Sequence, residues 1–137
     1  MKVIFTCGGT AGHVNPALAL AGYMRQQDPK ARFLFVGHGG LGHNLNSLAM
    51  LARSRSRARA ILRDFRPDLV VGTGGYASYP VLKCAAGMGI PTAVHESNMV
   101  PGLTTKMLEG SADRIMVGFE ECRRHNRHPG QLVVTGT

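Results

Sequence analysis

The stretch that decides the fold is Cys7-Gly8-Gly9-Thr10-Ala11-Gly12-His13-Val14-Asn15-Pro16. It lies between an apolar run, residues 3–5, and an Ala/Leu-rich segment with the composition of a helix. A strand, a glycine turn and a helix N-terminus together form an anion site, because glycines let a ligand approach the backbone and the first helical N–H groups have no intrahelical acceptor. We therefore expect a phosphate or diphosphate to bind at this turn.

The glycine spacing argues against two common classes of nucleotide-binding loop. It matches neither the dinucleotide G-x-G-x-x-G pattern nor the Walker loop, which disfavours nicotinamide cofactors and P-loop chemistry. The alternative is a tight strand-to-helix connection whose glycines serve packing alone. Thr10 and His13 favour ligand binding, because a packing turn at the end of a parallel strand needs neither polar side chain.

Length and composition indicate one soluble α/β domain. The chain has 137 residues, of which 44% are hydrophobic. Its three cysteines show no C-x-x-C spacing, so we expect a reducing compartment and neither a disulfide framework nor a zinc site. The chain shows no signal-peptide pattern and no apolar run of the roughly 18 residues that a spanning helix needs, and we expect a cytosolic protein.

Basic residues give the chain a net charge of +8, and its arginines gather in residues 53–66 and 123–127. Such clusters fit an anionic membrane surface, a nucleic acid or a polyanionic substrate, or they form a solvated helix face. Nucleic acid is disfavoured, because aromatic residues for base stacking make up only 6% of the chain. Among the functional readings, a membrane surface is preferred.

Continuous apolar runs of strand length predict the fold class. Because such runs suit strands that are buried on both faces, we expect a doubly wound, Rossmann-like α/β domain with a parallel sheet of about six strands and helices on both faces. The runs are residues 3–5, 33–36, 69–71, 92–94, 115–117 and 132–134.

Two helices and the strand order follow from the same pattern. We expect the first helix to begin with Asn15 as N-cap and Pro16 at its first position, and a long helix over residues 44–65. The crossover rule then gives the strand order 2-1-3-4-5, which places a ligand crevice between the first and third strands.

Three loops are expected to line that crevice: residues 8–13, 73–80 and 95–102. His13 is a candidate base, phosphate hydrogen-bond donor or helix cap, and Glu96 is expected to anchor neighbouring backbone N–H groups. Asn98 is a candidate contact for a sugar hydroxyl or amide. The dipeptide His95-Glu96 lacks the second histidine of a zinc protease motif, so we expect no metal.

With these loops placed, the sequence resembles the N-terminal domain of the MurG family, peptidoglycan N-acetylglucosaminyltransferases that convert lipid I to lipid II. The resemblance rests on residues 8–16 (Gly-Gly-Thr-Ala-Gly-His-Val-Asn-Pro), 67–76 and 90–98, and covers nearly the whole chain. It implies transfer from UDP-N-acetylglucosamine to a lipid-linked diphosphate acceptor, without cofactor or metal, on the cytoplasmic face of the bacterial cell membrane as a peripheral protein.

The resemblance also assigns residues. It places Thr10, Ala11 and Gly12 near the nucleotide-sugar diphosphate, and Asn98 on the donor. His13 matches the histidine proposed for acceptor activation or diphosphate binding. The second glycine loop, which is thought to hold the lipid I diphosphate, corresponds to Gly74, Gly75 and Tyr76.

The chain departs from the family pattern at three points. Ala11 stands where the family usually has glycine, the segment near residues 37–43 is much shorter, and the chain stops where the family continues into a C-terminal donor domain. We therefore expect residues 1–137 to be a single acceptor-side domain that is inactive in isolation and pairs with a complementing C-terminal domain. The alternatives are a non-catalytic fragment that binds anionic membrane or a partner through its arginine-rich helix, and a glycosyltransferase for another nucleotide sugar.

Overall fold

The computed structural model describes residues 1–37 and 48–136, with the side chains of residues 48–53 excepted. It contains one parallel sheet of six strands in the order β2-β1-β3-β4-β5-β6. The predicted doubly wound α/β class and strand order are confirmed. The strands are β1 (Lys2–Cys7), β2 (Arg32–Gly37), β3 (Leu69–Gly72), β4 (Thr92–Glu96), β5 (Arg114–Val117) and β6 (Leu132–Val134).

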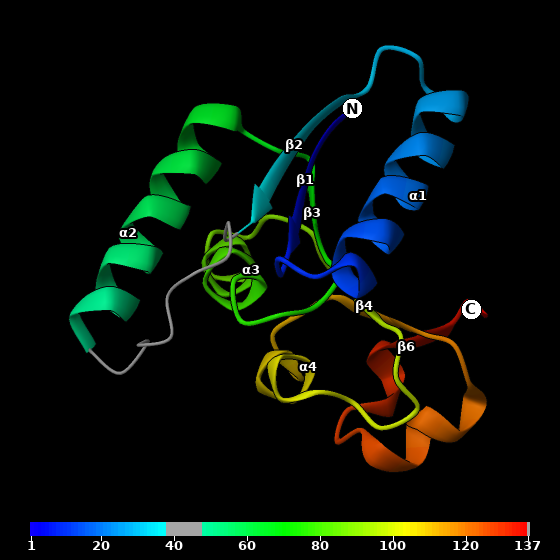
Figure 1. Ribbon diagram of the computed structural model, residues 1–137. Coiled ribbons are helices and arrows are strands. Elements are labelled where there is room, and N and C mark those ends of the chain that lie inside the picture. The colour runs from blue at the N-terminus through cyan, green and yellow to red at the C-terminus, as the bar shows by residue number, and fades with distance from the viewer. Residues whose placement is uncertain (38–47, 137) are drawn as a thin grey trace.

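Helices cover both faces of this sheet (Figure 1). One face packs on α1, and the other packs on α2, α3 and α4. No described helix is long and apolar enough to cross a membrane. The helices are α1 (Ala11–Gln27), α2 (Leu48–Phe65), α3 (Ser78–Gly87) and α4 (Leu103–Leu108), and two 3-10 turns, η1 (Glu120–His125) and η2 (Pro129–Gln131), precede β6.

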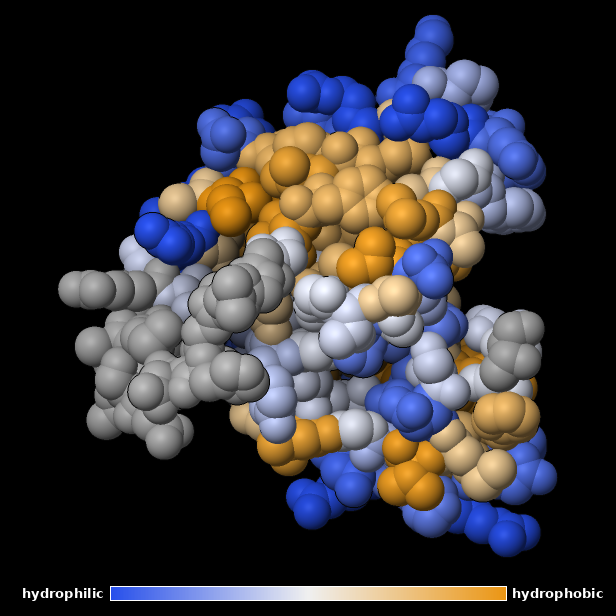
Figure 2. Space-filling model, in the orientation of Figure 1, coloured by the Kyte–Doolittle hydropathy of each residue, from blue (hydrophilic) through white to orange (hydrophobic). Residues whose placement is uncertain are grey.

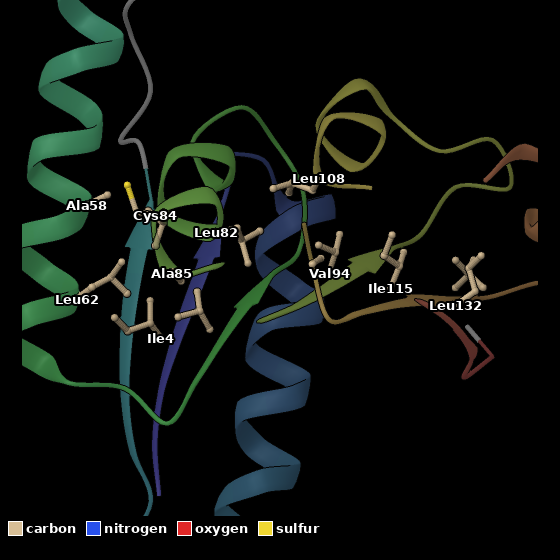
Figure 3. Close-up of a cluster of buried hydrophobic side chains, with 14 of the residues drawn as sticks. Ile4, Ala58, Leu62, Leu82, Cys84, Ala85, Val94, Leu108, Ile115 and Leu132 are labelled. Carbon is tan, nitrogen blue, oxygen red and sulfur yellow. The ribbon is translucent and has the colours of Figure 1, made fainter. Parts of the chain in front are cut away.

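Apolar strand residues face both helix layers, and the strand sequences are therefore continuous apolar runs. Ile4, Val94 and Ile115 point into the larger cluster beneath α2, α3 and α4 (Figure 3). Val3 and Phe5 point to the opposite side, against α1. The sheet is thereby fixed in register between two cores, and its carboxyl-terminal edge positions the loops that follow β1, β3 and β4.

Helix α1 begins five residues earlier than expected. Ala11 is its first residue and Thr10 its N-cap, so the prediction of an N-cap at Asn15 and a first helical position at Pro16 was wrong. The carbonyl of Thr10 accepts the N–H groups of His13 and Val14, both at 3.0 Å, and this closes the first turn ahead of the proline. The early start brings the free N–H groups of the first turn next to the glycine loop.

The described part of α2 has an apolar stripe and a charged face. Ala58 and Leu62 are buried against α3, while Arg59 and Arg63 are exposed. The predicted start near residue 44 and the side chain of Arg53 lie outside the described residues.

Candidate functional site

A cleft of about 360 Å³ opens at the carboxyl ends of β1, β3 and β4, where the strand order reverses. Parallel α/β sheets bind ligands at this position, because the loops of neighbouring strands diverge there. The three loops predicted to meet do meet. The lining includes Gly12, His13, Thr73, Gly74, Gly75, Tyr76, His95, Glu96, Ser97 and Asn98, together with residues 102–105 at the start of α4.

The two glycine loops are packed directly on each other. The N–H of Gly8 donates to the carbonyl of Gly74 at 2.8 Å. Gly75 has a φ of +84°, and a Cβ there would lie 2.6 Å from the Cα of Gly8. Gly74 has a φ of +112°, and a Cβ there would lie 2.5 Å from Nδ1 of His13. Both positions therefore require glycine, for conformation and for space.

His13 is held by two reciprocal contacts with Thr73. Its Nδ1 lies 3.1 Å from the Thr73 carbonyl, and the Thr73 hydroxyl donates to the His13 carbonyl at 2.5 Å. A carbonyl oxygen only accepts hydrogen bonds, so Nδ1 carries the proton. In the neutral ring, Nε2 is then unprotonated and can accept a proton from a ligand.

Glu96 ties together the loop after β4 and the start of α4. Its carboxylate is buried, and each of its two oxygens accepts two hydrogen bonds. One oxygen receives the backbone N–H and the side-chain amide of Asn98 at 2.9 and 2.8 Å. The other receives the N–H of Gly102 at 2.9 Å and the Thr105 hydroxyl at 2.6 Å. The expected anchoring role of Glu96 is confirmed.

His95 lies between this cleft and a second cavity of about 430 Å³, which Pro16, Leu20 and Tyr23 of α1 help to line. Burial lowers the pKa of its imidazole below the ordinary value of 6.5, and the neighbouring Glu96 carboxylate opposes this only in part. The lowered pKa favours the neutral ring, so His95 offers a negative ligand less charge attraction than an ordinary histidine does.

The predicted site residues separate into two groups. Gly12, His13, Gly74, Gly75, Tyr76 and Asn98 all line the cleft. Thr10 and Ala11 are exposed at the start of α1 and lie outside the lining. Ala11 is helical, and the one described non-glycine residue with positive φ is Arg66, so alanine at position 11 causes no backbone strain.

The sequence did not predict the roles of two residues at this site, Thr73 and Thr105. Thr73 orients His13, and Thr105 holds Glu96. A threonine directly after an apolar strand is a weak signal for the first of these. The second has no local signal, because Thr105 is nine residues from its partner and on the next helix.

A parallel, doubly wound sheet with glycine loops and a histidine around a cleft at its switch point defines a Rossmann-like ligand-binding domain of the α/β class. The chain belongs to the glycosyltransferase family 28 N-terminal domain family, whose model matches residues 3–47 and 37–117. The sequence-based recognition of this family is confirmed.

Curated relatives match this chain over nearly its whole length. The chain is 38% identical over 162 residues to the UDP-N-acetylglucosamine–N-acetylmuramyl-(pentapeptide) pyrophosphoryl-undecaprenol N-acetylglucosamine transferase of Alkaliphilus oremlandii, and 39% identical over 162 residues to that of Acetivibrio thermocellus. Each alignment covers 99% of this chain and 44% of the relative. The chain thus spans less than half the length of these relatives.

Solved structures agree with this assignment. Acinetobacter baumannii MurG superposes with a TM-score of 0.73 at 26% identity, over 88% of this chain and 42% of that protein. The UDP-GlcNAc 2-epimerase of Neisseria meningitidis, solved with bound UDP-GlcNAc, superposes with a TM-score of 0.73 at 14% identity, over 100% of this chain and 46% of the epimerase. This second likeness shows the fold alone.

Proposed function

We propose that residues 1–137 form the acceptor-side half of a transferase that moves N-acetylglucosamine from UDP-N-acetylglucosamine to lipid I and so makes lipid II. The observation that carries the proposal is the cleft at the switch point, where two interlocked glycine loops, His13 and Asn98 converge. The names of the curated relatives support this substrate pair.

Two diphosphates have separate places in this proposal. The lipid I diphosphate binds at Gly74, Gly75 and Tyr76, where the glycines leave the backbone accessible. The donor diphosphate binds at the start of α1, beside Thr10, Ala11 and Gly12, because the first N–H groups of this 17-residue helix have no intrahelical acceptor and carry partial positive charge. Asn98 contacts the donor from the opposite side of the cleft.

His13 is the catalytic base in this proposal. The acceptor sugar hydroxyl attacks the anomeric carbon of the donor, the bond from that carbon to the diphosphate oxygen breaks, and UDP leaves with the electron pair. Nε2 of His13 takes the proton of the attacking hydroxyl, since Nδ1 is already engaged with Thr73. The step needs neither a metal nor a cofactor.

The donor nucleotide requires a second wall in this proposal, which a complementing C-terminal domain supplies. The share of the relatives that this chain spans supports that requirement. We infer a peripheral enzyme at the cytoplasmic face of the membrane, where a lipid-linked acceptor and a soluble nucleotide sugar meet.

A transfer assay with labelled UDP-N-acetylglucosamine and a short-chain lipid I analogue tests this function. We expect no product from the chain alone, and product when the C-terminal half of the Acetivibrio thermocellus relative is added. His13→Ala should lower the rate about 100-fold in the mixture, because general-base catalysis is lost. His125→Ala, at an exposed histidine on η1, should leave the rate unchanged.

Product from the chain alone would refute the requirement for a second half. An unchanged rate in His13→Ala would remove the histidine as base. Calorimetry with the lipid I analogue and the chain alone tests the acceptor site independently, and a missing binding isotherm would contradict the placement of the lipid diphosphate at the second glycine loop.

The rim of the cleft is the proposed membrane contact. The diphosphate of a lipid-linked acceptor reaches the cleft while its prenyl chain stays in the bilayer, so the rim must face the lipid. Exposed apolar side chains gather there, with Lys106 among them: Met99, Val100, Leu103 and Met107 are 46–57% exposed. Apolar insertion beside a cation suits an anionic surface.

Vesicle flotation checks this contact. The double change Leu103→Gln with Met107→Gln should weaken binding to anionic phosphatidylglycerol vesicles about tenfold, because two exposed apolar side chains no longer enter the interface. The matched control, Leu18→Gln with Tyr23→Gln, alters comparably exposed side chains on α1 and should leave binding unchanged. Equal losses in both variants would contradict the rim as the contact.

The alternative function, a non-catalytic module that binds anionic membrane through α2, draws on the exposure of Arg55, Arg57, Arg59 and Arg63. The same flotation assay distinguishes it. Loss of binding in Arg59→Gln with Arg63→Gln, together with no response to the lipid I analogue, favours this alternative over the acceptor-side half.

A further inference from the structure

The outer edge of β2 carries backbone groups that pair with no described strand. Among the described strands, β2 pairs with β1 alone and ends the sheet. Figure 1 shows it at the edge of the sheet, between the layers that hold α1 and α2. In a strand with one neighbour, every second residue turns its N–H and C=O outward, and an edge of this kind is a template for another strand.

Both faces of this edge strand are apolar. Phe33 and Phe35 lie on the α1 side, where Phe35 stacks on Phe5 with ring centroids 5.3 Å apart. Leu34 and Val36 lie on the other side, against the larger core cluster. None of the four is fully buried, and Phe35 is 43% exposed. Figure 2 shows a broad apolar area in the upper middle of this face, bordered by hydrophilic side chains.

The relatives are longer than this chain over the region that they share with it. The two relatives align over 162 residues, whereas this chain has 137 in all. The family model matches in two pieces that overlap at residues 37–47, directly after β2. The relatives thus carry residues that the chain lacks, and their absence near 37–43 stays a prediction.

We propose that the open edge of β2 pairs with the same edge of a second copy of this chain, antiparallel across a two-fold axis, so that one sheet runs through both copies. An occupant of this edge must be apolar at consecutive positions, because it extends two cores at once. The strand Arg32–Gly37 itself has that pattern, with four apolar residues in a row.

Symmetry selects a register for this pairing. A two-fold axis perpendicular to the sheet keeps each face on its own side, so residues of like parity stand opposite one another. With Leu34 opposite its own copy, Phe33 faces the second Phe35, and Arg32 faces Val36. Aromatic side chains meet on the α1 side, and the two Arg32 side chains stay at opposite ends of the pair.

Repulsion between the two positively charged copies opposes dimerisation, so the dimer should depend on salt in a characteristic way. Each copy carries a net charge of +8, so screening by salt should strengthen the dimer. An acidic peptide bound at the same edge, between Arg25 and Arg32, would respond to salt in the opposite way.

Sedimentation equilibrium of the whole chain from 1 to 100 µM, in 50 and 300 mM NaCl, tests the proposal. We expect reversible dimerisation that tightens at the higher salt concentration. Phe35→Lys should weaken it by at least roughly tenfold, because a charge at an edge position disfavours strand addition. Phe119→Lys changes a comparably exposed phenylalanine, 38% accessible, and should leave the dimer intact.

Disulfide cross-linking between two copies tests the register, and it does not depend on whether Phe35→Lys folds. Mild oxidation of Leu34→Cys should give a covalent dimer, because the two substituted positions stand opposite each other. Leu18→Cys, on α1, should not, and the three native cysteines are buried. A monomer at 100 µM in both salt concentrations, or equal cross-linking of the two variants, would overturn the proposal.

Discussion

Replacing Gly75 by alanine is expected to destabilise the folded chain by about 3 kcal/mol. The φ of +84° costs an L-residue roughly 1–2 kcal/mol. The new Cβ would also lie 2.6 Å from the Cα and 2.9 Å from the N of Gly8, and backbone atoms cannot give way as a flexible side chain can. The two glycine loops would have to separate, at a further cost of about 1–3 kcal/mol.

Urea unfolding followed by circular dichroism measures this loss. Gly22→Ala is the matched control, since Gly22 lies inside α1 and a Cβ there meets nothing within 4 Å. It should stabilise the chain by about 0.5–1 kcal/mol, because alanine favours a helix interior over glycine. A Gly75→Ala variant as stable as the original would show that the two loops are not packed as described.

The second large effect is expected from Glu96→Gln, at about 3 kcal/mol of lost stability. Each oxygen of the Glu96 carboxylate accepts two hydrogen bonds, so a glutamine amide group must face two donors whichever way it turns. Two of these partly or fully buried hydrogen bonds are then lost, and a donor that is left without an acceptor there costs more than a surface hydrogen bond contributes. The loop with Asn98 and the start of α4 should loosen together.

The same unfolding assay tests this change, with amide hydrogen exchange at Asn98 and Gly102 as a local readout. Glu121→Gln, at an exposed position on η1, is the matched control and should change stability by no more than about 0.5 kcal/mol. If exchange at the N–H groups of Asn98 and Gly102 were as slow in Glu96→Gln as in the original chain, the carboxylate would not be what holds this loop.

These two positions explain how a cleft made of loops keeps its shape. Backbone contact between glycines holds the loops after β1 and β3, and one buried carboxylate holds the loop after β4. His13 and Asn98 are thereby presented from supports that do not rely on a bound ligand. Preorganisation of this kind reduces the entropy that binding must overcome.

The strands and their order were predictable because their physical cause is local. A strand that is buried on both faces must be apolar at consecutive positions, and the six runs show this directly. The start of α1 was not predictable in the same way. Asn15-Pro16 has the composition of a helix start, yet the helix begins five residues earlier, where the Thr10 carbonyl closes the first turn.

The sequence by itself determined the fold class, the strand order, the family and the three loops that line the cleft, because apolar periodicity and glycine spacing act over short stretches of chain. Only the tertiary structure decided which ring nitrogen of His13 is free and why Gly74 and Gly75 must be glycine. Both depend on contacts between loops that folding brings together, such as Thr73 with His13, sixty residues apart. Hydrogen-bond partners at such separations leave no local pattern in a single sequence.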